Sequence, residues 1–107
     1  MGKKISPSKA TKLCDNFDEK YLTLNTFIRK EDNRSVLFSI EELKDYFSYL
    51  EESGENVNGI RVYLGSNTET NLNTVFFAPT LDGKDNTTLD AYNYGGDGIP
   101  PSKKYGK

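Results

Sequence analysis

The chain has 107 residues, of which 35% are hydrophobic and 28% charged, with a net charge of −2 and no histidine. This length fits one domain, and the six Phe and seven Tyr offset the low apolar share because large rings bury much area. The mixed, near-neutral charge argues against a nucleic-acid binder, and the lack of histidine removes the commonest general base and metal ligand.

The first predicted element is a helix over about residues 7–22. Ser6 is a suitable N-cap and Pro7 a suitable first helical residue. Apolar residues then recur at steps of three and four, which indicates one buried stripe. Cys14 lies on that stripe, so we interpret it as a small buried hydrophobe rather than a nucleophile.

The segment after this helix is ambiguous. Leu24–Ile28 alternates like a short strand but could equally be a linker. Ser35–Phe38 is rich in β-branched and aromatic residues, and we predict a short strand there.

A capping box marks the second helix, which we predict over about residues 40–53. In this motif the Ser39 hydroxyl and the Glu42 carboxylate each accept a backbone N–H of the first turn. Gly54 follows as the C-cap, since glycine readily adopts a left-handed conformation.

Two apolar runs bounded by Gly or Pro, residues 60–65 and 74–79, predict an antiparallel hairpin. The polar loop 66–73 would connect the two strands. An isolated hairpin is marginal in water, so other elements must cover it.

Together these elements predict an α+β fold, in which a small antiparallel sheet of about three to four strands packs against two helices. Residues 1–89 would form a single domain, and residues 90–107 an irregular tail rich in Gly, Pro and Lys. Ile60, Val62 and Leu64 share one strand face. We expect that face to pack against the helices, on Leu13, Phe17, Leu43, Phe47 and Leu50.

Covering the sheet on one side would leave the other side open. We expect Val75, Phe77 and Tyr63 to form an apolar patch there. A homodimer, a partner protein or the C-terminal tail could cover this patch, and we favour association.

Three segments carry a resemblance: RSVLFSIEEL at 34–43, GIRVYLG at 59–65 and TVFFAPT at 74–80. In order and spacing, the chain resembles a group of small uncharacterised bacterial proteins of a kind found in Bacteroidetes genomes. The likeness covers roughly residues 6–83. It implies a bacterial cytoplasmic origin, and it carries no activity and no catalytic residues onto this chain.

Four oxygen-bearing side chains, Asp82, Asp85, Asn86 and Asp90, could suggest a calcium loop. Lys84 stands where such a loop needs another ligand, and the spacing ending in Glu is absent. We therefore interpret this segment as a solvated turn, and we expect no metal and no cofactor.

The candidate binding site lies on the sheet face opposite the helices, where Arg61 and Tyr63 should project together. Arginine beside tyrosine on a rigid strand can grip a carboxylate or phosphate through two parallel hydrogen bonds. Arg34 could join them if its strand pairs with theirs, and Asn67 and Asn71 would contribute from the loop at the rim. Arg61 could instead be a solvated residue or pair with an acid such as Asp82.

We therefore expect a small binding protein that recognises a protein partner or a small anionic ligand. The alternative is a metal-independent enzyme that works without histidine, through Arg, Tyr and carboxylate residues. A single cysteine, no secretory signal and no apolar run of membrane-spanning length predict a cytoplasmic protein without membrane or nucleic-acid partners.

Overall fold

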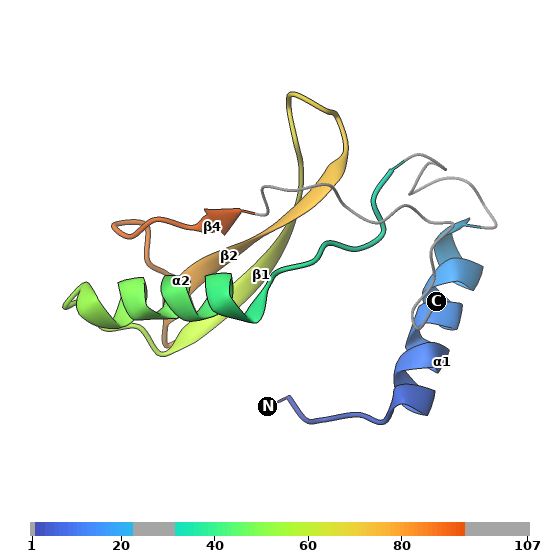
Figure 1. Cartoon of the computed structure of the whole chain (residues 1–107), viewed down its shortest axis with the longest axis horizontal. Helices are drawn as coiled ribbons and strands as arrows, with labels where there is room; N and C mark the ends of the chain where they lie inside the picture. Colours follow the sequence, from blue (N-terminus) through green and yellow to red (C-terminus); the bar gives the residue numbers. More distant parts are fainter. Residues whose placement is uncertain (1, 23–31, 94–107) are drawn as a thin grey trace. The chain divides into compact units, whose positions relative to one another are not determined.

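The structure, a computed structural model, describes residues 2–22 and 32–93. These residues fall into two compact units, the first with residues 2–22 and 32–34 and the second with residues 35–93. The fold is α+β, with two α-helices and a small antiparallel sheet, as the sequence predicts (Figure 1). None of the helices in these ranges is long and apolar enough to cross a membrane.

In the first unit, α1 (Pro7–Phe17) continues as a π-helical turn, η1 (Asp18–Leu22), so the predicted helical range is confirmed. The Ser6 hydroxyl caps the helix by accepting the Lys9 N–H at 3.1 Å. No residue of α1 is buried, and Leu13 is 50% exposed. The expected packing of Leu13 and Phe17 on the sheet stays a prediction.

In the second unit, α2 (Ile40–Glu52) begins with both hydrogen bonds of the predicted capping box. The Glu42 N–H donates to the Ser39 hydroxyl at 3.0 Å, and the Ser39 N–H donates to the Glu42 carboxylate at 2.6 Å. Gly54 follows the helix at a φ of 76°, the left-handed region that favours glycine at a helix end.

The predicted hairpin is also confirmed, as β1 (Gly59–Ser66) paired with β2 (Asn73–Leu81). On the other edge of β2 lie β3 (Lys84–Asp85) and β4 (Tyr92–Asn93), so β2 is the central strand. Figure 1 shows β4 beside β2. The sheet therefore extends beyond residue 89 into the predicted irregular tail. Residues 94–107 of that tail lie outside the described residues.

The predicted strand at Ser35–Phe38 is wrong, because only Ser35 has a bridge partner and the next four residues have no regular structure. This segment contacts the sheet through a side chain and not through strand hydrogen bonds. The Phe38 ring packs on Phe77 of β2 with 4.7 Å between ring centroids. Residues 24–28, the other ambiguous segment, lie outside the described residues.

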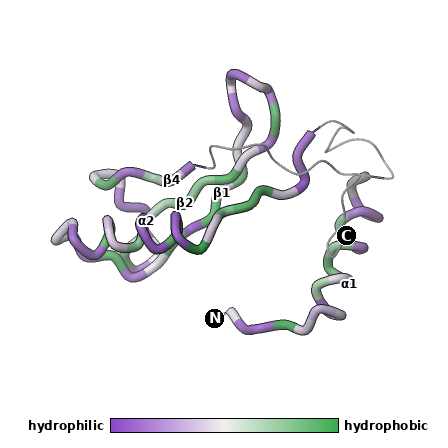
Figure 2. The backbone as a smooth tube through the Cα atoms, viewed as in Figure 1, coloured by the Kyte–Doolittle hydropathy of each residue, from purple (hydrophilic) through white to green (hydrophobic). Residues whose placement is uncertain are grey.

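The strand register shows which sheet face α2 covers. Val62 and Tyr92 are both cross-strand partners of Phe77, so all three side chains lie on one face. The Tyr92 ring stacks on Tyr46 of α2 at 5.0 Å, which identifies this face as the helix side. Figure 2 shows hydrophobic residues along β1 and β2, in the layer beside α2.

The predicted core is only partly correct. Ile60, Val62 and Leu64 do lie on the helix side of β1, but Val62 is 58% exposed and Leu64 77%. The reason is that β1 is an edge strand, whereas α2 directs Tyr46 toward β4, on the far side of β2. The buried apolar residues among those described are Tyr46, Leu50, Ala78 and Pro79.

The predicted patch of Val75, Phe77 and Tyr63 does not form, because these residues lie on opposite faces. Val75 and Phe77 face the helix side, where both are partly buried. Tyr63 lies on the other face opposite Phe76, and the two rings stack at 5.0 Å with planes 14° apart.

Candidate functional site

Arg61 and Tyr63 project from the sheet face opposite α2, and one carboxylate engages both. Arg61 Nη1 donates to Asp85 Oδ1 at 2.8 Å, and Tyr63 donates from its hydroxyl to Asp85 Oδ2. Arg61 Nη2 donates to the carbonyl of Gly83 at 2.7 Å. Both terminal nitrogens of the guanidinium therefore have partners within the chain.

The sequence left open that Arg61 pairs with an acid of the same chain, such as Asp82. In the structure Arg61 does pair with an internal acid, but that acid is Asp85. The pKa of Arg61 is raised above its ordinary value, first by its side-chain interaction with Tyr63 and then by the nearby charge of Asp85. Asp82 instead exchanges two hydrogen bonds with the Asn58 amide, at 2.9 and 3.0 Å. The turn between β2 and β3 is thus hydrogen-bonded to Asn58 and to Arg61 of β1, so Arg61 belongs to an internal cluster.

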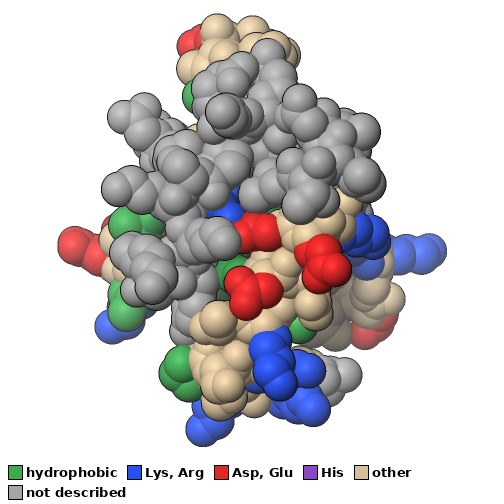
Figure 3. Space-filling view, turned by 90° about the vertical axis from the view of Figure 1, so that its right-hand side faces the viewer, with side chains coloured by type: hydrophobic (Ala, Val, Ile, Leu, Met, Phe, Trp, Pro, Cys, Tyr) green, Lys and Arg blue, Asp and Glu red, His purple; other side chains and the backbone are tan. Residues whose placement is uncertain are grey.

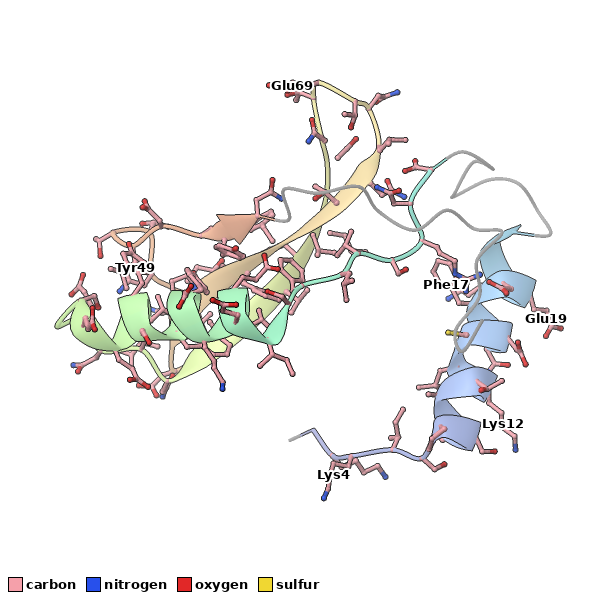
Figure 4. All side chains as sticks on the ribbon, viewed as in Figure 1. Lys4, Lys12, Phe17, Glu19, Tyr49 and Glu69 are labelled. Atoms are coloured by element: carbon pink, nitrogen blue, oxygen red, sulfur yellow. The ribbon has the colours of Figure 1, made fainter. Side chains whose placement is uncertain are left out.

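The structure does not bring Asn67 and Asn71 to Arg61. Asn67 begins the hairpin loop six residues beyond Arg61, which at about 3.3 Å per residue is roughly 20 Å along the strand. Its side chain accepts the N–H groups of Glu69 and Thr70, and Figure 4 shows Glu69 at the tip of this loop. Asn71 adopts a φ of 60°, a left-handed conformation that asparagine tolerates.

Arg34 belongs to the first unit. Its Nη2 lies 2.7 Å from Asp18 Oδ1, its guanidinium lies over the Phe17 ring at 5.9 Å, and its side chain is only 5% exposed. The strand pairing that would place Arg34 beside Arg61 is not formed, because β1 pairs with β2 alone among the described residues.

A different group of residues forms an open groove of about 360 Å³ beside α2. Among the residues that the structure describes, its lining contains three tyrosines, three acids and no basic residue, and we call it the tyrosine groove. Its lining residues are Glu42, Asp45, Tyr46, Tyr49, Asp90, Ala91 and Tyr92. They come from α2 and from the segment that leads into β4, two parts of the chain about forty residues apart.

The rings of the tyrosine groove are ordered by mutual contact. Tyr46 lies between Tyr92, at 5.0 Å, and Tyr49, at 5.9 Å, in near-stacked geometry. Tyr46 is buried, whereas Tyr49 is 38% exposed and extends from α2 toward the loop before β4 (Figure 4). One ring of the stack is therefore open to solvent at the groove.

Hydrogen bonds hold the two sides of the tyrosine groove together. Tyr46 donates to the Asp90 carbonyl at 2.8 Å, and the Asp90 N–H donates to the Tyr49 hydroxyl at 2.9 Å. Tyr92 donates to Glu42 Oε1 at 2.8 Å. These bonds use the Asp90 backbone, so its carboxylate and that of Asp45 have no hydrogen-bond partner among the described side chains.

Electrostatics differ between the acids and the phenols of the tyrosine groove. The hydrogen bond from the Ser39 N–H lowers the pKa of Glu42, and the bond from Tyr92 adds to this effect. Burial raises the pKa of Tyr46, and the hydrogen bond to Glu42 raises the pKa of Tyr92. At neutral pH the groove therefore combines the ionised Glu42 carboxylate with the neutral phenol rings of Tyr46 and Tyr92.

Sequence reasoning did not find this groove. In the sequence, Tyr46 and Tyr49 flank the apolar stripe of α2, and Tyr92 lies in the predicted irregular tail. The available signal was the spacing of three between Tyr46 and Tyr49, which places both rings on one helix face. Their partner Tyr92 follows 43 residues after Tyr49, and no local pattern connects them.

Within residues 2–22 and 32–93, no group of three or more acids and cysteines is arranged to hold a metal ion. Comparison of the chain with protein-family models, with curated proteins and with solved structures found no match.

Proposed function

We propose that this chain is a small cytoplasmic binding protein that recognises a cationic group of a partner protein through the tyrosine groove. The observation that carries the proposal is the composition of the groove, where the described lining brings three aromatic rings to three carboxylates and includes no basic side chain. A lysine ammonium or an arginine guanidinium is attracted both to an aromatic face and to a carboxylate.

The groove also has a suitable size and charge. Its volume of about 360 Å³ lies at the lower end of the range for ligand sites, which suits one side chain. Asp45 and Asp90 offer carboxylates that no described side chain occupies, and the exposed ring of Tyr49 offers a face for the cation.

Two expectations from the sequence remain open. A small anionic ligand at Arg61 is less favoured, because Asp85 and Gly83 already occupy its guanidinium. An enzyme without histidine would need a carboxylate of raised pKa beside a buried Arg or Tyr. The pKa of Glu42, which accepts the Tyr92 hydrogen bond, is lowered instead.

The other expected partners remain proposals. Figure 3 shows acidic and basic side chains mixed on one face, which supports the expectation of no nucleic-acid partner. The bacterial resemblance and the cytoplasmic location are proposed on the sequence alone.

The proposal can be tested by titration with N-acetyl-arginine methylamide and N-acetyl-lysine methylamide, followed by amide chemical shifts. We expect saturable shifts at Tyr49, Asp90 and Ala91, and none with the uncharged analogue N-acetyl-norleucine methylamide. Replacing Tyr49 with Leu should weaken binding by about two- to five-fold, the size of an exposed cation–π contact.

The control is the substitution of an acid that lies outside the groove, Asp85. Asp45→Asn combined with Asp90→Asn should weaken binding of the cationic probes further, whereas Asp85→Asn should leave it unchanged. Equal shifts with the norleucine analogue, or equal losses in both acid variants, would overturn the proposal.

A further inference from the structure

The outer edge of β1 is free of strand pairing among the described residues. The Asn67 N–H donates to the Leu72 carbonyl at 2.9 Å, which makes this a hydrogen-bonded pair of the hairpin. Hydrogen-bonded pairs recur every second residue, so Tyr63 and Arg61 also direct their backbone groups toward β2. Ile60, Val62 and Leu64 therefore direct their N–H and C=O groups outward.

The side chains along this edge are apolar and exposed. Val62 and Leu64, at 58% and 77% exposure, lie on the same face as Ile60. Edge strands are usually protected by lysine, proline, a bulge or an inward-pointing charge. Here the one charged residue, Arg61, turns to the opposite face and pairs with Asp85.

We propose that β1 pairs antiparallel with β1 of a second copy of this chain, around a two-fold axis at Val62. The choice of a second copy rests on self-complementarity. With Val62 opposite Val62 of the partner subunit, Ile60 lies opposite the partner's Leu64, and their outward backbone groups meet as hydrogen-bonded pairs. Six apolar side chains then form one continuous row.

The same register satisfies the other face, because Arg61 lies opposite the partner's Tyr63, a cation against an aromatic ring. Centring the axis on Arg61 would place two guanidinium groups opposite each other, which is unfavourable. Centring it on Tyr63 would place Ile60 opposite the partner's Ser66 and shorten the apolar row. Charge and apolar contact therefore select the register centred on Val62.

This interface is independent of the tyrosine groove. Tyr92 of the groove belongs to β4, on the opposite edge of β2 from β1. The dimer therefore leaves the tyrosine groove of each subunit open to a partner. Loss of dimerisation does not imply loss of cation binding in the groove, and loss of cation binding does not imply loss of dimerisation.

Sedimentation velocity of the full chain, from about 1 µM to 1 mM, tests the proposal over the range of weak, small interfaces. We expect the mass to rise with concentration from 12.1 kDa toward twice that value. Val62→Lys should keep the chain monomeric, and Leu13→Lys, at an apolar residue of α1 with comparable exposure (50% against 58%), should leave the dimer intact. Circular dichroism of both variants verifies that they fold.

Amide hydrogen exchange adds a readout specific to the register. The N–H groups of Ile60, Val62 and Leu64 should exchange rapidly in dilute solution and at least tenfold more slowly in the dimer, whereas Arg61 and Tyr63 stay protected throughout. A monomer at all concentrations would overturn the proposal, whether the edge is open or another segment of the chain protects it. A dimer that persists in Val62→Lys would overturn it as well.

Discussion

The hydroxyl of Tyr46 donates a 2.8 Å hydrogen bond to the carbonyl of Asp90, 44 residues further along the chain. Tyr46 is only 5% exposed, so this bond satisfies a polar group that has left water. It also joins α2 to the segment before β4. The first residues of the predicted tail are therefore part of the folded second unit.

Removing this bond should destabilise the protein. We expect Tyr46→Phe to lower the free energy of unfolding by about 1 kcal/mol or somewhat more, because the Asp90 carbonyl loses its donor. Chemical denaturation measures the change. Tyr63→Phe, which deletes a hydroxyl bonded to an exposed carboxylate, should cost less, and equal losses would contradict the expected role of burial.

Stability should also fall at alkaline pH. Burial first, and then the nearby Tyr49 and Asp90, raise the pKa of Tyr46 above its ordinary value of 10.0. The stabilisation is therefore fully present below pH 10 and is lost as the pH rises through the higher pKa of the folded state. Thermal unfolding between pH 9 and 12 should show this decline, and Tyr46→Phe should reduce its slope. An unchanged slope in the variant would contradict the assignment to Tyr46.

The capping box should contribute measurably to α2. Ser39→Ala removes the acceptor of the Glu42 N–H and should cost about 1 kcal/mol of unfolding free energy. Ser48→Ala, an exposed site within the same helix, is the control and should be neutral or slightly stabilising. A comparable loss in both variants would show that the cap is not the cause.

The Arg61 cluster should contribute little to stability despite its four hydrogen-bonding groups. The Arg61 and Asp85 side chains are 43% and 32% exposed, and ion pairs at such sites contribute little because solvent screens them. Arg61→Ala and Asp85→Asn should thus each lower the melting temperature by only a few degrees. A much larger loss would indicate that further interactions depend on this pair.

The ion pair of the first unit should matter more. The Arg34 and Asp18 side chains are 5% and 14% exposed, and an ion pair shielded from solvent in this way contributes more than an exposed one. Arg34→Ala should therefore reduce the helical circular dichroism signal of α1. The double variant with Asp18→Asn should lose less than the sum of the two single variants, and strict additivity would exclude a direct coupling.

Local patterns in the sequence were enough to predict both helices and the hairpin. The capping box at Ser39, the glycine at position 54 and the alternation of residues 60–65 each act within a few residues, so their structural consequences can be read directly. The shared position of Arg61 and Tyr63 on the side of β1 opposite α2 followed from the same period of two.

The tertiary structure alone decided which strand lies at the edge of the sheet and which lies at its centre. Val62 is exposed because β1 lies at the sheet edge, and Phe77 is covered because β2 lies at the centre. β2 is central because β3 and β4 pair with its second edge and not with β1. The tyrosine groove depends in the same way on contacts between residues 42–49 and 90–92. Such contacts reflect the packing of distant segments, which local periodicity does not encode.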